Sequence, residues 1–316
     1  MLIKSNDSLL AIDLATDAVR VLDVRMKRAE AQIEGFATQS VAAGTPETLP
    51  ERHLEALGAL IATNRFKSRK CVAAMPTSLI TTRAVAIDPN KPQPADEQVR
   101  WTLQNCLPFD PRDLIFDYWP VGNSPANART RDVLVVAMQG SVVKRYLAGL
   151  ERQKLTCVHL DVAPCAVASL IARLAAASDA VVGAVTLTDT GGYFAIVERQ
   201  RVLFWRPFEF PPIKPGASRE AAMDRIGDEI SKCVSHMVGS MQVDHMAELL
   251  TFGNGAEDST FSDYLQDRFH MPVRSPSPFD GFSPEAMPLE VRSAVEPAVA
   301  SHYAAAVGLA MQPAGV

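Results

Sequence analysis

Two aspartates of this chain stand at the ends of apolar segments and are followed at once by short polar turns. Asp13 closes the apolar run 9–13, and Asp189 closes the apolar run that begins at residue 184. The turn residues after them are Ala15 and Thr16 in the first case and Thr190 and Gly191 in the second. Backbone N–H groups of such turns cradle phosphate oxygens, and a neighbouring carboxylate holds Mg²⁺, usually through waters. Asp13 and Asp189 are therefore candidate metal ligands, and both turns are candidate nucleotide-binding elements.

A third turn in the second half of the chain has the sequence Gly253-Asn254-Gly255. A glycine has no Cβ, so its backbone can approach a base or a ribose closely. Aspartate and glycine also favour hairpin turns for conformational reasons alone, and either aspartate turn taken singly is explained that way. Two aspartate turns followed by a late glycine turn, in this order, favour a nucleotide cleft.

The elements that must position these turns form a duplicated pattern. Each aspartate turn joins two predicted strands, and the two units lie 189 − 13 = 176 residues apart. Apolar runs and alternation predict strands, and 3.6-residue spacing predicts helices. The predicted strands lie within 9–24, 32–40, 70–76, 79–87, 114–121, 133–138, 184–197, 201–205 and 249–252, and the predicted helices are 47–63, 97–107, 142–153, 163–177, 218–241, one that contains Phe261, and one within 299–311. Strands with helical crossovers in each half predict an α/β architecture.

Composition narrows the function classes. The 316 residues carry 31 Lys+Arg against 36 Asp+Glu, a net charge of −5, which argues against a nucleic-acid-coating surface. Hydrophobic residues at 47% and charged residues at 21% indicate a globular chain. Five scattered cysteines without a CxxC pair are typical of reduced thiols. No segment reaches the roughly 18–20 apolar residues of a membrane span, so we expect a cytoplasmic protein that reaches a membrane only through a partner.

The order of the three turns resembles that of the actin/Hsp70/sugar-kinase superfamily, in which the chain most resembles the PilM family of type IV pilus assembly. The segments that carry the resemblance are 11–22, Leu107-Pro108-Phe109-Asp110, Phe116-Asp117-Tyr118, 133–137, 158–161, 187–191, 204–206, 253–255 and 306–310. The resemblance implies an actin-like fold of duplicated domains with a small inserted α+β subdomain. It also implies ATP and Mg²⁺ as ligands and adds Arg20 to the nucleotide-binding residues.

The resemblance also implies a division of the chain. Residues 1–81 and 159–182 would form the first actin-like lobe, 82–158 an inserted subdomain like that of the cell-division protein FtsA, and 183–316 the second lobe. The proline-rich stretch 88–94 independently marks a boundary near the start of the insert.

Three positions depart from the family pattern. Ala15 stands where the family has glycine, so a turn that needed positive φ there would be strained. Arg20 stands where the family has lysine, which keeps the charge and changes the geometry. Asn254 splits the usual glycine pair, although asparagine tolerates left-handed backbone better than most residues.

Hydrolysis needs a group that orients the attacking water, and the sequence offers two weak candidates. Asp161 is either that group or an N-cap of the following helix, and Glu229 is either that group or a solvated residue on a long helix. The pattern therefore predicts at most a weak ATPase.

The resemblance implies a scaffold at the cytoplasmic face of the inner membrane. Its partner would be a PilN-like membrane protein, bound through its cytoplasmic N-terminal peptide, together with other components of the pilus platform. Such tails bind as an added strand or in a groove between subdomains. The alternatives are an actin homologue of the type II secretion or FtsA kind, or a small-molecule kinase of the same superfamily, for which no convincing catalytic base is present.

Overall fold

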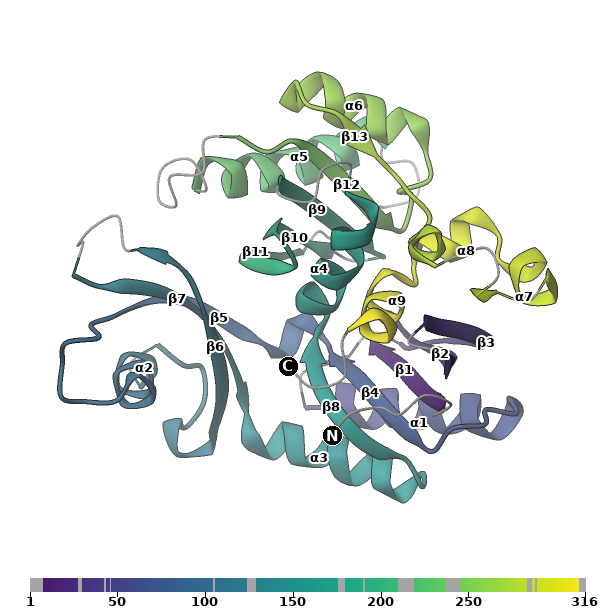
Figure 1. The fold of residues 1–316 in the computed structure, drawn as a ribbon, viewed down its shortest axis with the longest axis horizontal. Coiled ribbons are helices and arrows are strands. Elements are labelled where there is room, and N and C mark those ends of the chain that lie inside the picture. The colour runs from purple at the N-terminus through teal and green to yellow at the C-terminus, as the bar shows by residue number, and fades with distance from the viewer. Residues whose placement is uncertain are drawn as a thin grey trace.

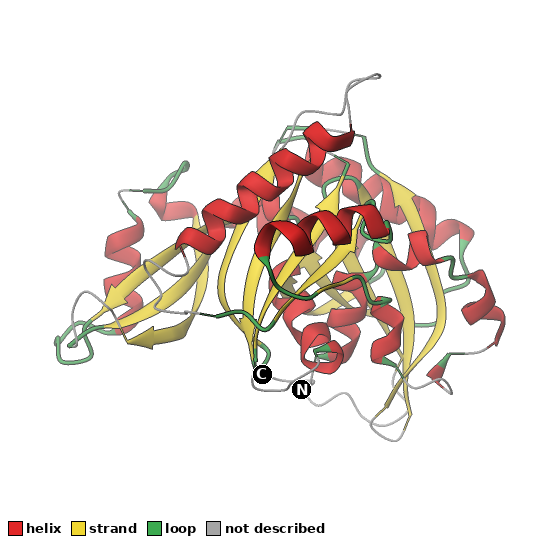
Figure 2. Ribbon diagram, turned by 90° about the horizontal axis from the view of Figure 1, so that it is seen from above, coloured by secondary structure: helices red, strands yellow, loops and turns green. Residues whose placement is uncertain are grey.

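The computed structural model describes residues 8–27, 30–42, 44–45, 47–104, 106–123, 129–175, 180–189, 191–209, 219–236, 245–282, 286–287 and 289–312. Two five-stranded sheets with helices packed on them form the body of the molecule. A three-stranded sheet with one helix projects from one side of this body, as both views show (Figure 1, Figure 2). The mixed α/β architecture is the one that the alternating pattern predicted.

The first sheet has the strand order β3-β2-β1-β4-β8. Its strands are β1 (Ser8–Leu14), β2 (Ala18–Lys27), β3 (Glu30–Ser40), β4 (Lys70–Met75) and β8 (Thr156–Val162). β1, β2 and β3 are antiparallel neighbours, whereas β4 runs parallel to β1 and β8 runs parallel to β4. Helix α1 (Leu49–Thr63) packs on β2 and β3, and α9 (Ala304–Met311) packs on β1, β2 and β4. The central strand β1 is buried along nearly its whole length, as its continuous apolar run predicts.

The second sheet repeats this topology in the order β11-β10-β9-β12-β13. Its strands are β9 (Val181–Thr188), β10 (Gly191–Glu198), β11 (Arg201–Glu209), β12 (Glu248–Gly253) and β13 (Val273–Arg274). Again three strands are antiparallel, and the last two run parallel to the central one. Helices α5 (Arg219–His236) and α6 (Ser259–Phe269) belong to this part, and α8 (Pro297–Ser301) contacts β12, whereas α7 (Leu289–Ala294) packs on β3 of the first sheet. The predicted duplication of the strand–turn–strand unit is therefore confirmed, and the structure extends it to five strands in each sheet.

The third sheet, in the order β5-β7-β6, has a hydrophobic core of its own. It contains β5 (Thr81–Ile87), β6 (Leu114–Asn123) and β7 (Arg131–Gln139), with helix α2 (Ala95–Leu103) packed on β5. The following helix α3 (Gly140–Arg152) instead packs on α1 and β8. We propose that the insert spans 81–139 rather than 82–158, because α3 and β8 join the first sheet. The remaining lobe boundaries stay predictions.

Several elements differ from the sequence-based expectations. β8 was not predicted, because this edge strand carries Thr156, His159 and Asp161 and lacks a clean apolar pattern. Helix α5 is described only to His236, so the predicted continuation to residue 241 lies outside the described residues. The predicted C-terminal helix is two helices, α8 and α9. None of the helices in the described ranges is long and apolar enough to cross a membrane.

A close helix pair joins the two sheets. Helix α4 (Ala163–Leu174) contacts β10 and β11 of the second sheet and packs lengthwise on α9, which covers the first. The backbones approach so closely that a Cβ placed on Gly308 would lie 1.9 Å from the carbonyl oxygen of Ala166. One hydrophobic cluster runs through both helices and both sheets, so the cleft between the sheets rests on a packed base.

Candidate functional site

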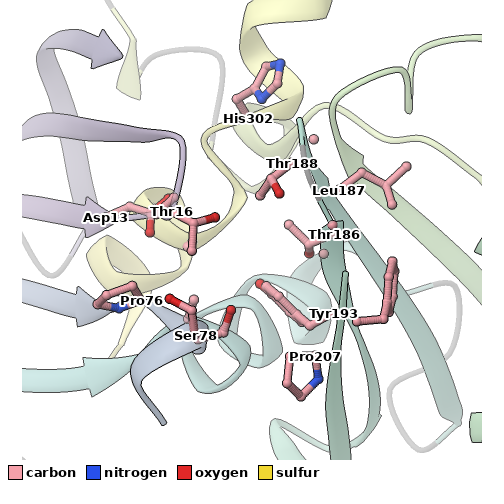
Figure 3. Close-up of a pocket in the computed structure, with 18 of the residues that line it drawn as sticks. Asp13, Thr16, Pro76, Ser78, Thr186, Leu187, Thr188, Tyr193, Pro207 and His302 are labelled. Carbon is pink, nitrogen blue, oxygen red and sulfur yellow. The ribbon is translucent and has the colours of Figure 1, made fainter. Parts of the chain in front are cut away.

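A pocket of about 90 Å³ lies between the two sheets, at the ends of β1 and β9. Figure 3 shows its two walls: Asp13, Thr16, Pro76 and Ser78 on the side of the first sheet, and Thr186, Thr188, Tyr193 and Pro207 on the side of the second, with His302 beside them. Six of the predicted nucleotide-binding residues line it, namely Asp13, Ala15, Thr16, Arg20, Gly191 and Gly253. Because β1 and β9 occupy equivalent central positions in the two sheets, the duplication brings both turns to one cleft.

Asp13 is a buried carboxylate whose charge is compensated by one arginine. Its side chain lies 3.6 Å from the guanidinium of Arg20, and the residue is only 4% exposed. Burial raises the pKa of Asp13 to about 7, and the positive charge of Arg20 opposes part of that rise. The carboxyl group of Asp13 therefore changes charge near neutral pH.

The guanidinium of Arg20 is shared among several groups on the pocket wall. It donates a hydrogen bond of 3.0 Å to the carboxylate of Asp17, and it lies 3.4 Å from Nδ1 of His302. Burial and the charge of Arg20 both lower the pKa of His302. Neutral His302 can accept a hydrogen bond from Arg20, so the positive charge of this cluster is that of Arg20, which is paired with the carboxyl groups of Asp17 and Asp13.

A buried histidine holds the turn after Asp13 in place through a hydrogen bond. Nε2 of His53 lies 2.8 Å from the carbonyl oxygen of Ala15, and Nδ1 lies 2.6 Å from the hydroxyl of Tyr146. Burial lowers the pKa of His53 to about 4, so the ring is neutral and donates to the Ala15 carbonyl from one nitrogen. The expected strain at Ala15 does not occur: the non-glycine residues with positive φ in the described ranges are Lys154, Arg199, Gln200 and His270.

The glycines of the second sheet have a packing role that the sequence did not reveal. A Cβ on Gly191 would lie 2.3 Å from the carbonyl oxygen of Phe208, and one on Gly192 would lie 2.2 Å from that of Thr186. Gly253 has a φ of +87°, and a Cβ there would lie 2.0 Å from the carbonyl oxygen of Leu187. The backbones of neighbouring strands lie so close together that these positions require glycine, whether or not a nucleotide binds.

The remaining predicted residues lie beside the pocket or outside the described ranges. Asp189 is exposed at the β9–β10 turn, and its carboxylate accepts a hydrogen bond from the side-chain amide of Asn254. Neither of them, nor Gly255, lines the pocket. Gly255 has a φ of +73°, which explains a glycine at that position. Thr190 lies outside the described residues.

The donors around the pocket fit the phosphates of a nucleotide better than they fit a preformed metal site. Arg20 and the hydroxyls of Thr16 and Ser78 supply positive charge and hydrogen-bond donors. The buried hydroxyls of Thr186 and Tyr193 lie together in the pocket wall, where Thr186 opposes part of the rise that burial causes in the pKa of Tyr193. In the described ranges, no group of three or more His, Cys, Asp or Glu is placed to hold a metal. Mg²⁺ typically uses one or two carboxylates plus phosphates. Of the two predicted metal ligands, Asp13 lines the pocket and Asp189 does not, so their joint role stays a prediction.

Neither candidate for orienting a water lines this pocket. The carboxylate of Asp161 accepts hydrogen bonds from the side chain of Gln312 and from the N–H of Val162. The N-cap interpretation of Asp161 is wrong, because α4 begins after Val162 and has no side-chain cap. Glu229 is paired with Lys232 on α5 at 2.5 Å.

Sequence analysis missed the residues that reach the pocket from outside the three turns. Ser78, Tyr193 and His302 come from three different parts of the chain and are brought together by tertiary structure alone. Only the hydroxyl-rich segment Pro76-Thr77-Ser78 after β4 carried a local signal, because the strand end beside β1 must face the same cleft.

Sequence comparison identifies one family. A family model described as type IV pilus assembly protein PilM matches residues 11–211. A comparison with curated proteins gives no significant match.

Comparison with solved structures supports an actin-like fold. A chain of a PilM–PilN type IV pilus biogenesis complex is 18% identical, with a TM-score of 0.73, and the match covers 96% of this chain and 98% of that one. A Bacteroides thetaiotaomicron protein with an actin-like ATPase fold and unknown function is 12% identical, with a TM-score of 0.52 and coverages of 89% and 98%. The cytoplasmic domain of EpsL, from the type II secretion system of Vibrio cholerae, is 12% identical, with a TM-score of 0.50 and coverages of 78% and 82%.

Proposed function

Because this chain belongs to the PilM family of type IV pilus assembly proteins, we propose that it is a scaffold of the pilus inner-membrane platform that binds the N-terminal peptide of a PilN-like membrane protein. The observation that carries the proposal is the match over nearly the full length of both chains to a component of a PilM–PilN complex. In this role the protein acts in the cytoplasm and is held at the inner membrane by its partner.

Three exposed apolar side chains lie on elements at or near the junction of the insert and the first sheet, and they suit such a peptide. Ile115 on β6, Leu147 on α3 and Val158 on β8 are 45%, 40% and 44% exposed. β6 and β8 are the outer strands of their sheets (Figure 1). A free strand edge with apolar side chains beside it can bind an extended peptide by main-chain hydrogen bonds.

Negative charge near this surface favours a peptide with a positive terminus. Burial raises the pKa of Asp161 on β8, and the carboxylate of Asp117 on β6 is close enough to add to the rise. The two strands therefore carry neighbouring carboxyl groups, which complement the α-amino group of a chain that begins in the cytoplasm. We accordingly place the partner peptide between β6 and β8.

Fluorescence anisotropy with a labelled N-terminal peptide of the PilN-like partner tests this proposal. Val158→Glu and Ile115→Glu should weaken binding at least tenfold, about 1.4 kcal/mol. Leu289→Glu is the matched control, because Leu289 is 76% exposed on α7, away from this surface. Absence of binding to the folded wild type, or an equal loss in the control, contradicts the proposal.

We further propose that the cleft binds ATP as a conformational ligand, without efficient hydrolysis. The donors of Arg20, Thr16 and Ser78 support phosphate binding, and neither carboxylate proposed for hydrolysis lines the pocket. Calorimetry with ATP and Mg²⁺ should give binding to the wild type that is lost in the Asp13→Asn, Asp189→Asn double variant. If the wild type does not bind ATP, the scaffold acts without nucleotide and this part of the proposal fails.

A further inference from the structure

Two cysteines lie directly opposite each other on neighbouring strands of the first sheet. Cys71 on β4 and Cys157 on β8 are register partners in a parallel pair. Both are free thiols. Neighbouring strands lie about 4.7–4.9 Å apart, inside the range of about 4.4–6.8 Å that a disulfide requires between Cα atoms. Register partners of neighbouring strands project to the same face of a sheet, so both side chains lie on one face, where the Cys157 thiol donates a 3.2 Å hydrogen bond to the carbonyl oxygen of His159.

A β-bulge beside this pair makes one of the two sulfurs reachable. The partners of Cys71 and Val72 are Cys157 and His159, so Val158 is the extra residue of β8. β8 is an outer strand, Cys157 is partly exposed and Val158 is 44% exposed. Cys71, by contrast, is fully buried. A small reagent can therefore reach Cys157 first.

The two thiols also differ in acidity. The neighbouring Cys71 lowers the pKa of Cys157, which increases the thiolate fraction of Cys157 at neutral pH. The neighbouring Cys157 and burial raise the pKa of Cys71, so Cys71 stays protonated until it reacts. A partly exposed thiolate next to a buried thiol is the arrangement of an attacking and a resolving cysteine.

We propose that Cys71 and Cys157 form a reversible disulfide, with a low-molecular-weight disulfide such as oxidised glutathione as the oxidant. The thiolate of Cys157 attacks one sulfur of the small disulfide, and the other half leaves as a thiolate. Cys71 then attacks the Cys157 sulfur in the mixed disulfide, and its proton goes to the second half, which leaves as a thiol. The protein loses two electrons and two protons, and one small disulfide becomes two small thiols.

The bond would act on the strand to which the partner peptide is assigned. A Cys71–Cys157 disulfide ties β8 to β4 at the bulge, next to Val158, and so fixes the conformation of this edge. Oxidation is then expected to change the affinity for the peptide at least threefold. This consequence rests on the proposed function, whereas formation of the bond does not.

Thiol counting and peptide mapping on the native full-length chain test the bond itself. After incubation with oxidised glutathione, the wild type should lose two of its five free thiols, and digestion should yield one fragment that joins Cys71 to Cys157. Cys71→Ala should stop at a glutathione adduct on Cys157, and Cys157→Ala should keep Cys71 reduced. Cys71→Ser provides a second variant if the alanine leaves a destabilising cavity. Cys106→Ala, at a partly exposed cysteine of the insert, should behave as the wild type.

The outcomes separate this inference from the proposed function. A folded wild type that keeps all five thiols, stops at the glutathione adduct or pairs other cysteines overturns the disulfide, whatever the peptide does. If the disulfide forms and the reduced protein does not bind the peptide, the proposed function fails and the disulfide stands. If the peptide binds both redox forms equally, the regulatory consequence is wrong.

Discussion

The guanidinium of Arg20 lies 3.6 Å from the carboxylate of Asp13, and both residues are buried at the wall of the cleft. Arg20 also bonds Asp17, so one cation compensates two carboxylates. Removal of one partner from a buried ion pair leaves an uncompensated charge, which is costly in a medium of low polarity. This cluster therefore links the stability of the fold to the charge state of the cleft.

Asp13 should make stability fall as the pH rises. Its folded pKa is about 7 against 3.8 for the free side chain, so between these values the folded state binds more protons than the unfolded state. The contribution is fully present below pH 3.8 and is lost as the pH rises through 7. In urea denaturation, the free energy of unfolding of Asp13→Asn, relative to that of the wild type, should rise by up to about 3 kcal/mol from pH 5 to pH 8. Each pKa unit is worth about 1.4 kcal/mol. A constant difference across this range contradicts the prediction.

Sequence analysis could predict the two aspartate turns because their signal is local. The apolar run before Asp13 and the alternation after Gly191 fix strand, turn and strand within a few residues. It could not predict β8, because the polar edge of a sheet has no distinctive periodicity. It also explained Gly191 and Gly253 by nucleotide binding. In the structure, carbonyl oxygens of neighbouring strands lie so close to both residues that neither can carry a Cβ.

The cluster of charges at the cleft was beyond sequence reasoning for a different reason. Asp17 is a local neighbour of Arg20, but His302 reaches Arg20 only because α9, which follows His302, packs on the first sheet. Spacing along a sequence carries no information about such long-range contacts. The family resemblance identified Arg20 as a nucleotide-binding candidate, and the structure identifies the groups that Arg20 contacts.

His53 should have the opposite pH dependence to Asp13. Burial lowers its folded pKa to about 4 from 6.5, so the unfolded state binds more protons between these values and stability is lost as the pH falls through them. His53→Leu should remove this slope and cost about 1–3 kcal/mol at pH 7.5, because the carbonyl of Ala15 and the hydroxyl of Tyr146 lose their partner. Urea denaturation across pH 4–8 measures both effects. His245→Leu, at an exposed histidine, is the control and should leave the slope unchanged.

Gly308 should tolerate no side chain. A Cβ there would lie 1.9 Å from the carbonyl oxygen of Ala166, so Gly308→Ala must push α9 away from α4. We expect a loss of about 1–3 kcal/mol in the free energy of unfolding. Gly35→Ala on β3 is the control, because nothing lies within 4 Å of the added Cβ. Equal stabilities of the two variants would show that the α4–α9 contact is looser than described.

Arg20 should carry the phosphate affinity of the cleft. It is the one Lys or Arg among the described residues that line the pocket, and charge-assisted hydrogen bonds to phosphate are among the strongest in proteins. Arg20→Ala alone would leave Asp13 and Asp17 uncompensated, so the informative variant combines Arg20→Ala with Asp13→Asn and Asp17→Asn. In calorimetry, ATP affinity of this triple variant should fall at least tenfold relative to the Asp13→Asn, Asp17→Asn variant, with and without Mg²⁺. Arg112→Ala, at an exposed arginine of the insert, is the matched control and should bind as the wild type does. Unchanged affinity of the triple variant would show that Arg20 does not bind the phosphates.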